Sequence, residues 1–277
     1  MELPGRLVLL GHPVAHSRSP ALHNAALRSA GIGLEYVAVD VPPADLDAAV
    51  HQLVAERAAG NVTTPHKRRM LELCGELTPL ARRTGAVNSF RVRNGVLQGE
   101  NTDIHGFQAL AEQVLGGAPR DRSVAVLGTG GAASAVLAAV EGWPDSRAVV
   151  LSRSVDRARR LAAHFPGVAS AGTDLETAIA EADIVVNATP LGLGDHDPFP
   201  ADLDLLSPGT AVLDLTYAAG RTRWVREAAA RGYPAADGAS MLLEQGVAAF
   251  VHWLGVEPDR EAMRAALAAS LGGEEAR

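Results

Sequence analysis

Short hydrophobic runs alternate with amphipathic segments along the first sixty residues of the chain. The hydrophobic runs have the length and the β-branched content of strands, and the segments between them have helical periodicity. This alternation predicts a mostly parallel sheet with helices on its faces. We expect strands at 7–11, 35–41 and 61–64, and helices at 19–31 and 43–60.

Local signals indicate where some of these elements end. Ser19 is a candidate N-cap for the first helix, Pro20 suits its first position, and Gly31 suits the position just past its end. The dipeptide Asn-Gly at 94–95 lies between two short strand-like runs, which predicts a β-hairpin.

A second alternating series begins after a helical segment at 104–116. The chain then closes with two helical segments and no further strand, a pattern typical of terminal helices that pack back on the first domain. We therefore expect an α/β protein of two domains, 1–103 with 238–277 and 104–237. The strands of the second series are expected at 123–128, 147–152, 183–189 and 210–216, and the closing helices at 240–255 and 257–270.

Composition narrows the class of protein. The 277 residues are 47% hydrophobic and 21% charged, with a mean hydropathy of +0.07, so a globular core is expected. The net charge of −7 without a basic run argues against a nucleic-acid partner. The single cysteine, Cys74, cannot form an internal disulfide, which favours a reducing, cytoplasmic location. The uncharged stretch 124–140 is too short and too glycine-rich for a membrane span, so no membrane association is expected.

The segment VLGTGGAASAVL, 126–137, places glycines between a predicted strand and a predicted helix. Glycines there allow a tight turn and let backbone amides approach a pyrophosphate at the helix N-terminus. The following strand, about 20 residues on, completes the context of a dinucleotide site. The residues expected at the cofactor are Gly128, Thr129, Gly130, Gly131 and Ala132.

The end of the next strand indicates which dinucleotide is bound. It carries SRSVDR, with no acidic residue at the strand end for a ribose 2′-hydroxyl. A guanidinium pairs well with a 2′-phosphate, so NADP is favoured. The candidate residues are Ser152, Arg153, Ser154 and Arg157, although both arginines could instead be solvated charges at a helix start.

Polar side chains recur where the strands of the first domain end. The segments GHPVAHSRSP, NVTTPHK, GAVNS and GENTD carry serines, a threonine, asparagines, a lysine and an aspartate. Ligands of parallel sheets bind at the carboxyl ends of strands, and this set of groups suits a small polyhydroxylated acid. The histidines nearby lack the spacing of a metal site, so no metal is expected.

These segments resemble the shikimate dehydrogenase family. The matching pieces occur in the family's order from about residue 8 to residue 255, and they include GTGGAASA, SRSVDR, NATPLG, DLTY and DGASMLLEQGVAAF. The resemblance implies NADPH-dependent reduction of 3-dehydroshikimate to shikimate by a substrate domain and a Rossmann-type NADP-binding domain. It also implies that Lys67 and Asp103 are catalytic. An ammonium beside the reacting oxygen would stabilise the charge that hydride addition builds there.

The resemblance further implies two sets of binding residues. Shikimate or 3-dehydroshikimate would be bound by Ser17, Ser19, Thr63, Lys67, Asn88, Asp103, Tyr217 and Gln245. The nicotinamide end of NADP would meet Thr189, Leu215, Gly238 and Met241.

Several of these residues have simpler interpretations when taken singly. Lys67 could be a surface charge, Asp103 could cap the helix that follows it, and Asn88 could close a turn. Ser19 could be only an N-cap, and Gln245 could be a buried residue bonded to backbone.

Other functions stay open at this point. The chain departs from the common family pattern at Thr64, Thr129, Ser152 and Ala219, which bears on substrate and cofactor preference. A quinate or aminoshikimate dehydrogenase and a non-catalytic binding homologue are the alternatives. Ser19, where a threonine would favour quinate, favours shikimate, and Lys67 with Asp103 favours catalysis. The chain is expected to be a monomer or a homodimer.

Overall fold

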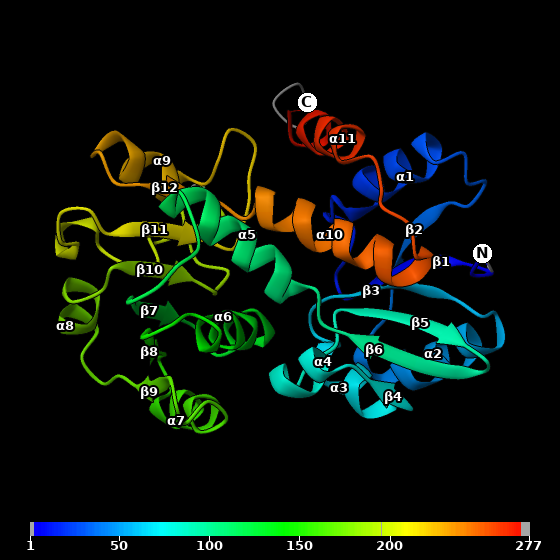
Figure 1. Ribbon diagram of the computed structural model, residues 1–277, viewed down its shortest axis with the longest axis horizontal. Helices are drawn as coiled ribbons and strands as arrows, with labels where there is room; N and C mark the ends of the chain where they lie inside the picture. The colour runs from blue at the N-terminus through cyan, green and yellow to red at the C-terminus, as the bar shows by residue number, and fades with distance from the viewer. Residues whose placement is uncertain (1–2, 195, 273–277) are drawn as a thin grey trace. The chain divides into compact units, whose positions relative to one another are not determined.

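Two six-stranded sheets organise the chain, which the computed structural model describes at residues 3–194 and 196–272. Each sheet belongs to one compact unit (Figure 1). The first unit comprises residues 1–103 with 242–277, and the second comprises 104–241, so the second division lies a few residues beyond the expected 237. The α/β class and the terminal helices of the first unit are confirmed.

The sheet of the first unit is mixed, with strand order β2-β1-β3-β5-β6-β4. β1, β2 and β3 are parallel, whereas β5 runs antiparallel to both β3 and β6. The β5–β6 pair is the hairpin predicted from Asn94 and Gly95, which both have positive φ. Its elements are β1 (Leu7–Gly11), α1 (Ser19–Ser29), β2 (Tyr36–Asp40), η1 (Pro43–Asp45), α2 (Leu46–Ala55), β3 (Ala59–Val62), α3 (Lys67–Leu73), β4 (Glu76–Leu77), α4 (Pro79–Thr84), β5 (Ser89–Arg93), β6 (Val96–Glu100), α10 (Ala239–Leu254, which starts in the second unit) and α11 (Arg260–Gly272).

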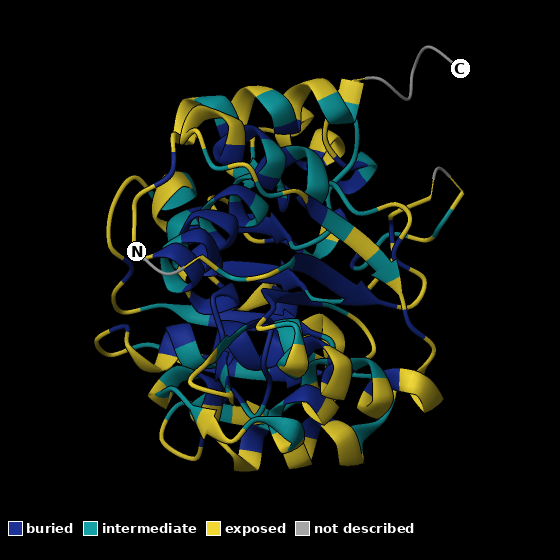
Figure 2. Ribbon diagram, turned by 90° about the vertical axis from the view of Figure 1, so that its right-hand side faces the viewer, coloured by how far each residue is buried: buried dark blue, intermediate teal, exposed yellow. Residues whose placement is uncertain are grey.

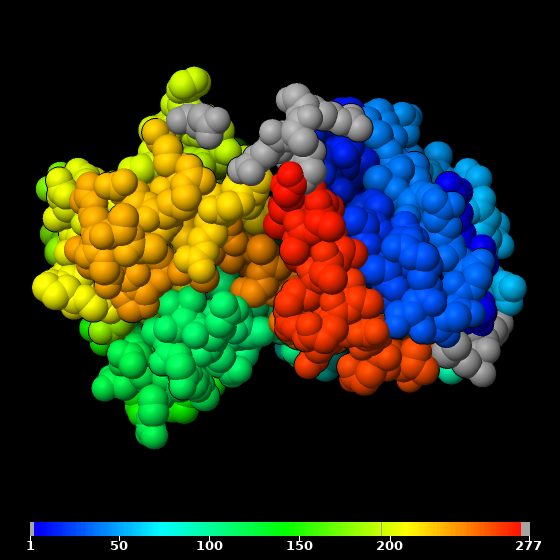
Figure 3. All heavy atoms as spheres, turned by 90° about the horizontal axis from the view of Figure 1, so that it is seen from above, coloured from blue at the N-terminus to red at the C-terminus, as the bar shows by residue number. Residues whose placement is uncertain are grey.

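Helices cover both faces of this sheet. α1, α10 and α11 pack over one face with a core that includes Leu22, Phe250 and Met263, and α2 and α3 pack over the other with Leu46 and Met70. Figure 2 shows the central strands buried and the exposed residues on the outer sides of the helices. The indole of a further α10 residue, Trp253, donates to Ser89 Oγ on β5 at 2.9 Å. In Figure 3, α11 (red) lies along α1 (blue), so the last helix packs on the first unit.

The sheet of the second unit is wholly parallel, with strand order β12-β11-β10-β7-β8-β9. Numbered within the unit, this is the 3-2-1-4-5-6 order of the Rossmann fold, whose order reverses between β7 and β10. Its elements are α5 (Asp103–Leu115), β7 (Ser123–Leu127), α6 (Gly131–Glu141), β8 (Arg147–Leu151), α7 (Val155–Ala163), β9 (Ala169–Ala171), α8 (Leu175–Ala180), β10 (Ile184–Asn187), η2 (Leu203–Leu205), β11 (Ala211–Asp214), α9 (Arg223–Ala230) and β12 (Ala235–Ala236).

Two local predictions were wrong. The helix expected at 43–60 ends at Ala55, shortly before Arg57, which has positive φ, and the Gly60 expected to end the helix belongs to β3. A Cβ on Gly60 would lie 1.8 Å from the Val8 carbonyl oxygen, so the close approach of β1 requires glycine there. Ser19 is not the N-cap of α1 either, because that position is Arg18.

None of the helices in the described parts of the chain is long and apolar enough to cross a membrane.

Candidate active site

Lys67 and Asp103 form an ion pair in the first unit, with Nζ donating to Oδ2 at 2.6 Å. Lys67 is the first residue of α3, just past the end of β3, and Asp103 is the first residue of α5, just past β6. The lysine side chain is 19% exposed and the aspartate side chain 8% exposed. The structure therefore excludes both a free surface lysine and an aspartate that serves only as a helix cap.

Asn88 holds the other oxygen of this aspartate. Its Nδ2 donates to Asp103 Oδ1 at 2.7 Å and also lies 3.0 Å from Thr102 Oγ1 and 3.2 Å from Gln245 Oε1. Its Oδ1 accepts from the Thr102 backbone amide at 2.7 Å. Because the amide group of Asn88 is buried and bonded on both sides, its orientation is fixed by the protein. Asn88 does more than close a turn.

Asn101 and Thr102 also support the site: Asn101 is one of the polar residues noted at the strand ends, without a binding role, and Thr102, in the same segment GENTD, was not predicted. Asn101 is fully buried, and its Oδ1 accepts from the Asp103 amide at 3.1 Å. Its Nδ2 donates to the Ala86 carbonyl and to Thr84 Oγ1. These bonds fix the backbone that presents Asp103. Whether a side chain such as that of Asn101 is buried depends on tertiary packing. The segment GENTD was therefore the sequence signal that could have indicated these two residues.

Gln245, on α10, belongs to the same hydrogen-bond network as Asn88 and Thr102. Its Nε2 donates to the Leu242 carbonyl at 3.2 Å, while its Oε1 lies 3.4 Å from Thr102 Oγ1 and accepts from Asn88. One end of the Gln245 amide is therefore bonded to backbone, and the other end joins the network around Asp103.

Ser17 and Thr63 lie in the loops after β1 and β3, and Ser19 is the first residue of α1. Ser17 Oγ accepts from the Ser19 amide at 3.3 Å, and Thr63 donates its amide to the Leu10 carbonyl at 2.8 Å. A Cβ on Gly11 would lie 2.5 Å from Thr63 Cγ2, so the two loops touch. Parallel neighbours place these hydroxyls at the same sheet edge. Tyr217, expected at the substrate, follows β11 in the second unit.

The glycine loop of the second unit connects β7 to α6. Gly128 has φ +117°, and a Cβ there would lie 2.7 Å from the Ala188 carbonyl oxygen. At Gly130, the N-cap of α6, a Cβ would meet nothing within 4 Å, so the backbone faces open space. Gly131 and Ala132 form the first turn, and Thr129 lies between the glycines. An open helix N-terminus of this kind suits a pyrophosphate.

The end of β8 presents two exposed arginines. Ser154 caps α7 by accepting from the Arg157 amide, and Ser152 Oγ accepts from the Ser154 amide at 3.2 Å. Within 3–194 and 196–272, neither Arg153 nor Arg157 makes an ion pair. The nearby Asp156 lies in α7, 3.7 Å from Arg159. The donor set at this strand end is cationic, which suits a 2′-phosphate.

Asn187 and Asp214 join the ends of β10 and β11. Asn187 Nδ2 donates to Asp214 Oδ1 at 2.9 Å, and Asn187 Oδ1 accepts from the Thr189 hydroxyl at 2.6 Å. Asp214 Oδ2 accepts from the Thr222 hydroxyl at 2.9 Å. Burial raises the pKa of Asp214, and its hydrogen bonds oppose that shift. This network fixes the two loops that follow the central strands.

The remaining cofactor candidates lie beside these loops. Gly238 donates to the Thr216 carbonyl at 2.8 Å, and a Cβ there would be 2.5 Å from the Leu215 carbonyl oxygen. Met241, in the first turn of α10, is buried. The described residues contain no cluster of three or more metal-binding side chains.

Family models match most of the chain. The shikimate dehydrogenase substrate-binding domain matches residues 9–90, shikimate / quinate 5-dehydrogenase matches 109–191, and the shikimate 5′-dehydrogenase C-terminal domain matches 238–268. The NADP⁺-dependent shikimate dehydrogenase of Rubrobacter xylanophilus is 44% identical, over 94% of each chain.

Solved structures agree with the sequence matches. The shikimate 5-dehydrogenase of Thermus thermophilus in complex with NADP(H) and shikimate is 38% identical, with a TM-score of 0.84 over 98% of this chain and 100% of that one. The quinate dehydrogenase of Corynebacterium glutamicum in complex with NAD is 31% identical, with a TM-score of 0.86 over 95% and 98%. On the strength of these matches, the chain belongs to the shikimate dehydrogenase family.

Proposed function

We propose that this protein catalyses the reversible NADPH-dependent reduction of 3-dehydroshikimate to shikimate. The observation that carries the proposal is the partly buried Lys67–Asp103 ion pair, whose aspartate is held on its other oxygen by Asn88. NADP is favoured as the cofactor by the cationic end of β8. It is also favoured by the NADP⁺-dependent enzyme of Rubrobacter xylanophilus and by the NADP(H) complex of the Thermus thermophilus enzyme. The best-supported activity is therefore that of an NADP-dependent shikimate dehydrogenase.

Lys67 is the proposed acid in the reduction. Addition of hydride to the carbonyl carbon puts negative charge on the oxygen, and the Lys67 ammonium stabilises that charge and gives it a proton. In the reverse direction the neutral amine takes the proton back from the hydroxyl. Asp103 holds the ammonium in place and accepts from the substrate hydroxyl, while Asn88 keeps the carboxylate oriented.

The residues that bind the other polar groups of the substrate are assigned from the hydrogen bonds that their side chains can make. Ser17 and Ser19 are proposed to donate to its carboxylate, and Thr63, Asn88, Tyr217 and Gln245 to bind its carboxylate and hydroxyls. All but Tyr217 lie in the first unit, which is therefore the proposed substrate domain.

The second unit is the proposed NADP domain. When bound, NADPH supplies the hydride. The backbone amides at Gly130 and Gly131 would hold its pyrophosphate at the start of α6, and Arg153 and Arg157 would hold its 2′-phosphate, with Ser152 and Ser154 beside them. Thr189, Leu215, Gly238 and Met241 are proposed to bind the nicotinamide end. Location in the cytoplasm and a monomeric or homodimeric state remain predictions.

The test is a substrate and cofactor panel. Purified protein is assayed by nicotinamide absorbance with 3-dehydroshikimate or 3-dehydroquinate, each with NADPH and NADH. Turnover that is fastest with NADPH and 3-dehydroshikimate supports the proposal. Preference for 3-dehydroquinate would assign the protein to the quinate branch, and no turnover with any pair would favour a binding homologue.

A further inference from the structure

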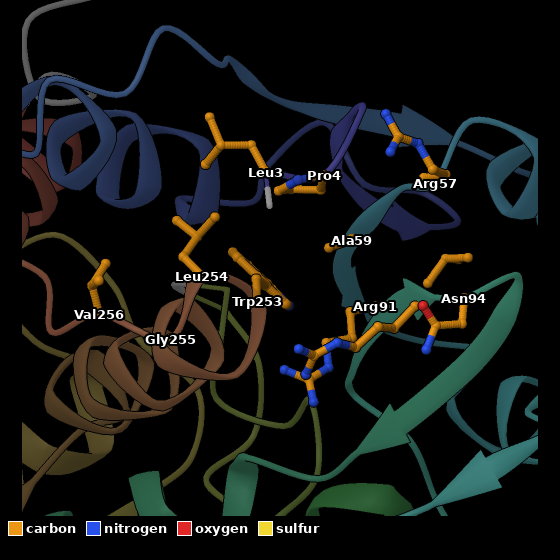
Figure 4. A pocket seen from close by; sticks show the side chains of 12 residues that line it. Leu3, Pro4, Arg57, Ala59, Arg91, Asn94, Trp253, Leu254, Gly255 and Val256 are labelled. Atoms are coloured by element: carbon orange, nitrogen blue, oxygen red, sulfur yellow. The ribbon is translucent and has the colours of Figure 1, made fainter. Parts of the chain in front are cut away.

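A cavity of about 360 Å³ lies in the first unit, away from the Lys67–Asp103 pair, which contributes none of its lining residues. It is formed where α10 ends over the sheet, between the β5–β6 hairpin and the start of the chain (Figure 4). Its size is at the lower end of the range for small-molecule sites. The cavity has two chemically different parts.

One part is cationic. Arg57, Arg91 and Arg93 line it with Asn94, and none of the described residues that line the cavity is acidic. Arg91 and Arg93 occupy alternate positions of β5, so their side chains leave the same face of the strand. Figure 4 shows Arg91 reaching towards the end of α10, with Arg57 across the cavity.

These two β5 arginines lack a carboxylate partner. Arg91 donates from Nε to Gln98 Oε1 at 2.8 Å and from a terminal nitrogen to the His252 carbonyl at 2.6 Å, and both acceptors are neutral. Across residues 3–194 and 196–272, the side chain of Arg93 makes no hydrogen bond or ion pair. Burial and then repulsion from Arg93 lower the pKa of Arg91, with Glu100 opposing them. An anion in the cavity would relieve this repulsion.

The other part is apolar. Trp253, Leu254 and Val256 line it from α10 and the residues after it, with Leu3, Pro4 and Ala59 opposite. The indole nitrogen of Trp253 is already bonded to Ser89, so the ring presents only apolar surface to the cavity. Aromatic or aliphatic groups of a ligand would pack here.

We propose that this cavity binds a small organic anion, with its carboxylate or phosphate at Arg91 and Arg93 and its apolar body against Trp253 and Leu254. Two guanidiniums that lack a carboxylate partner would bind the anionic group of such a ligand, and the apolar wall would bind its apolar body. The site is separate from the proposed active site and stands independently of the proposed activity.

The test is calorimetric titration of the full chain with benzoate and with phenyl phosphate at constant ionic strength, with benzyl alcohol as the neutral probe. Binding of either anion but not of the alcohol is expected, and the tighter anion identifies the preferred head group. Arg93→Gln should weaken that binding at least about fivefold, because one charged hydrogen bond is lost. Arg93→Glu should weaken it further. Arg93 is exposed and unbonded, so both variants should fold.

Two matched variants distinguish this cavity from other anion sites. Arg264→Gln removes an exposed arginine of α11, and Ser19→Ala alters the proposed carboxylate site; neither should change the affinity. Absence of binding, equal weakening by Arg264→Gln, or weakening by Ser19→Ala but not by Arg93→Gln would each overturn the proposal. Loss of dehydrogenase activity with intact anion binding would count against the proposed function alone.

Discussion

Lys67 Nζ and Asp103 Oδ2 lie 2.6 Å apart although 36 residues separate them in the chain. The pairing arises because β3 and β6 run in the same direction on either side of β5. The residues that follow the two strands therefore lie at the same edge of the first sheet. A pair this buried keeps its geometry only if other bonds satisfy the carboxylate, and Asn88 supplies one of them.

Thr102→Val tests the support of this pair. The change removes a hydroxyl 3.0 Å from Asn88 Nδ2 while keeping the side chain's shape. We expect the free energy of unfolding to fall by about 1 kcal/mol, as for loss of one buried hydrogen bond. A looser Asn88 should also lower kcat/KM for 3-dehydroshikimate by about tenfold, equivalent to 1.4 kcal/mol. Steady-state kinetics and denaturant unfolding measure the two effects.

Thr102→Ser is the matched variant, because it keeps the hydroxyl and should restore most of kcat/KM. If valine and serine behave alike, the hydroxyl has no part in positioning Asn88.

Arg153→Ala tests the assignment of the cofactor. Loss of a guanidinium at a 2′-phosphate should raise KM for NADPH about tenfold or more. KM for NADH should change little, because NADH lacks that phosphate. Arg159→Ala, in the helix α7 that follows Arg153 and paired with Asp156, serves as the control. Equal effects of Arg153→Ala on both cofactors would rule out a role at the 2′-phosphate.

His23 should make stability depend on pH. It is fully buried against Tyr36 and Trp253, and burial lowers its pKa to about 3. The unfolded chain, with a histidine pKa near 6.5, therefore binds a proton that the folded protein excludes as the pH falls below about 6.5. The free energy of unfolding should fall by up to about 1.4 kcal/mol per pH unit between pH 6 and pH 4.

His23→Phe removes this titration and keeps an aromatic ring against Tyr36 and Trp253, so its stability should depend less steeply on pH over that range. His51→Phe, at an exposed site on α2, should keep the wild-type slope. Denaturant melts at several pH values measure the slopes, and a wild-type slope in His23→Phe would exclude His23 as the source.

Much of the fold could be predicted because the strong signals were local. The long hydrophobic strands, the Asn94-Gly95 turn and the glycine loop at 128–131 depend on residues close in sequence. Short elements such as α3, β4 and β12 were missed, because two to seven residues carry little periodicity. The end of α2 was misplaced because Gly60 is required by the close approach of Val8, a contact that no local pattern reveals.

The site shows the same division. Lys67, Asp103, Asn88 and Gln245 could be named from motifs, and the structure joins all four in one network. Thr102 was not predicted because its role depends on the fold, which places Asn88 against both its hydroxyl and its backbone amide.

The most direct test of the account is the turnover of Lys67→Ala with NADPH and 3-dehydroshikimate, measured beside its affinity for NADPH. Loss of the proton donor should lower kcat by about 10²–10⁴-fold while the Kd for NADPH stays unchanged. Arg68→Ala, a neighbouring exposed cation, should keep wild-type kcat. A Lys67→Ala variant with full kcat would contradict the proposed mechanism.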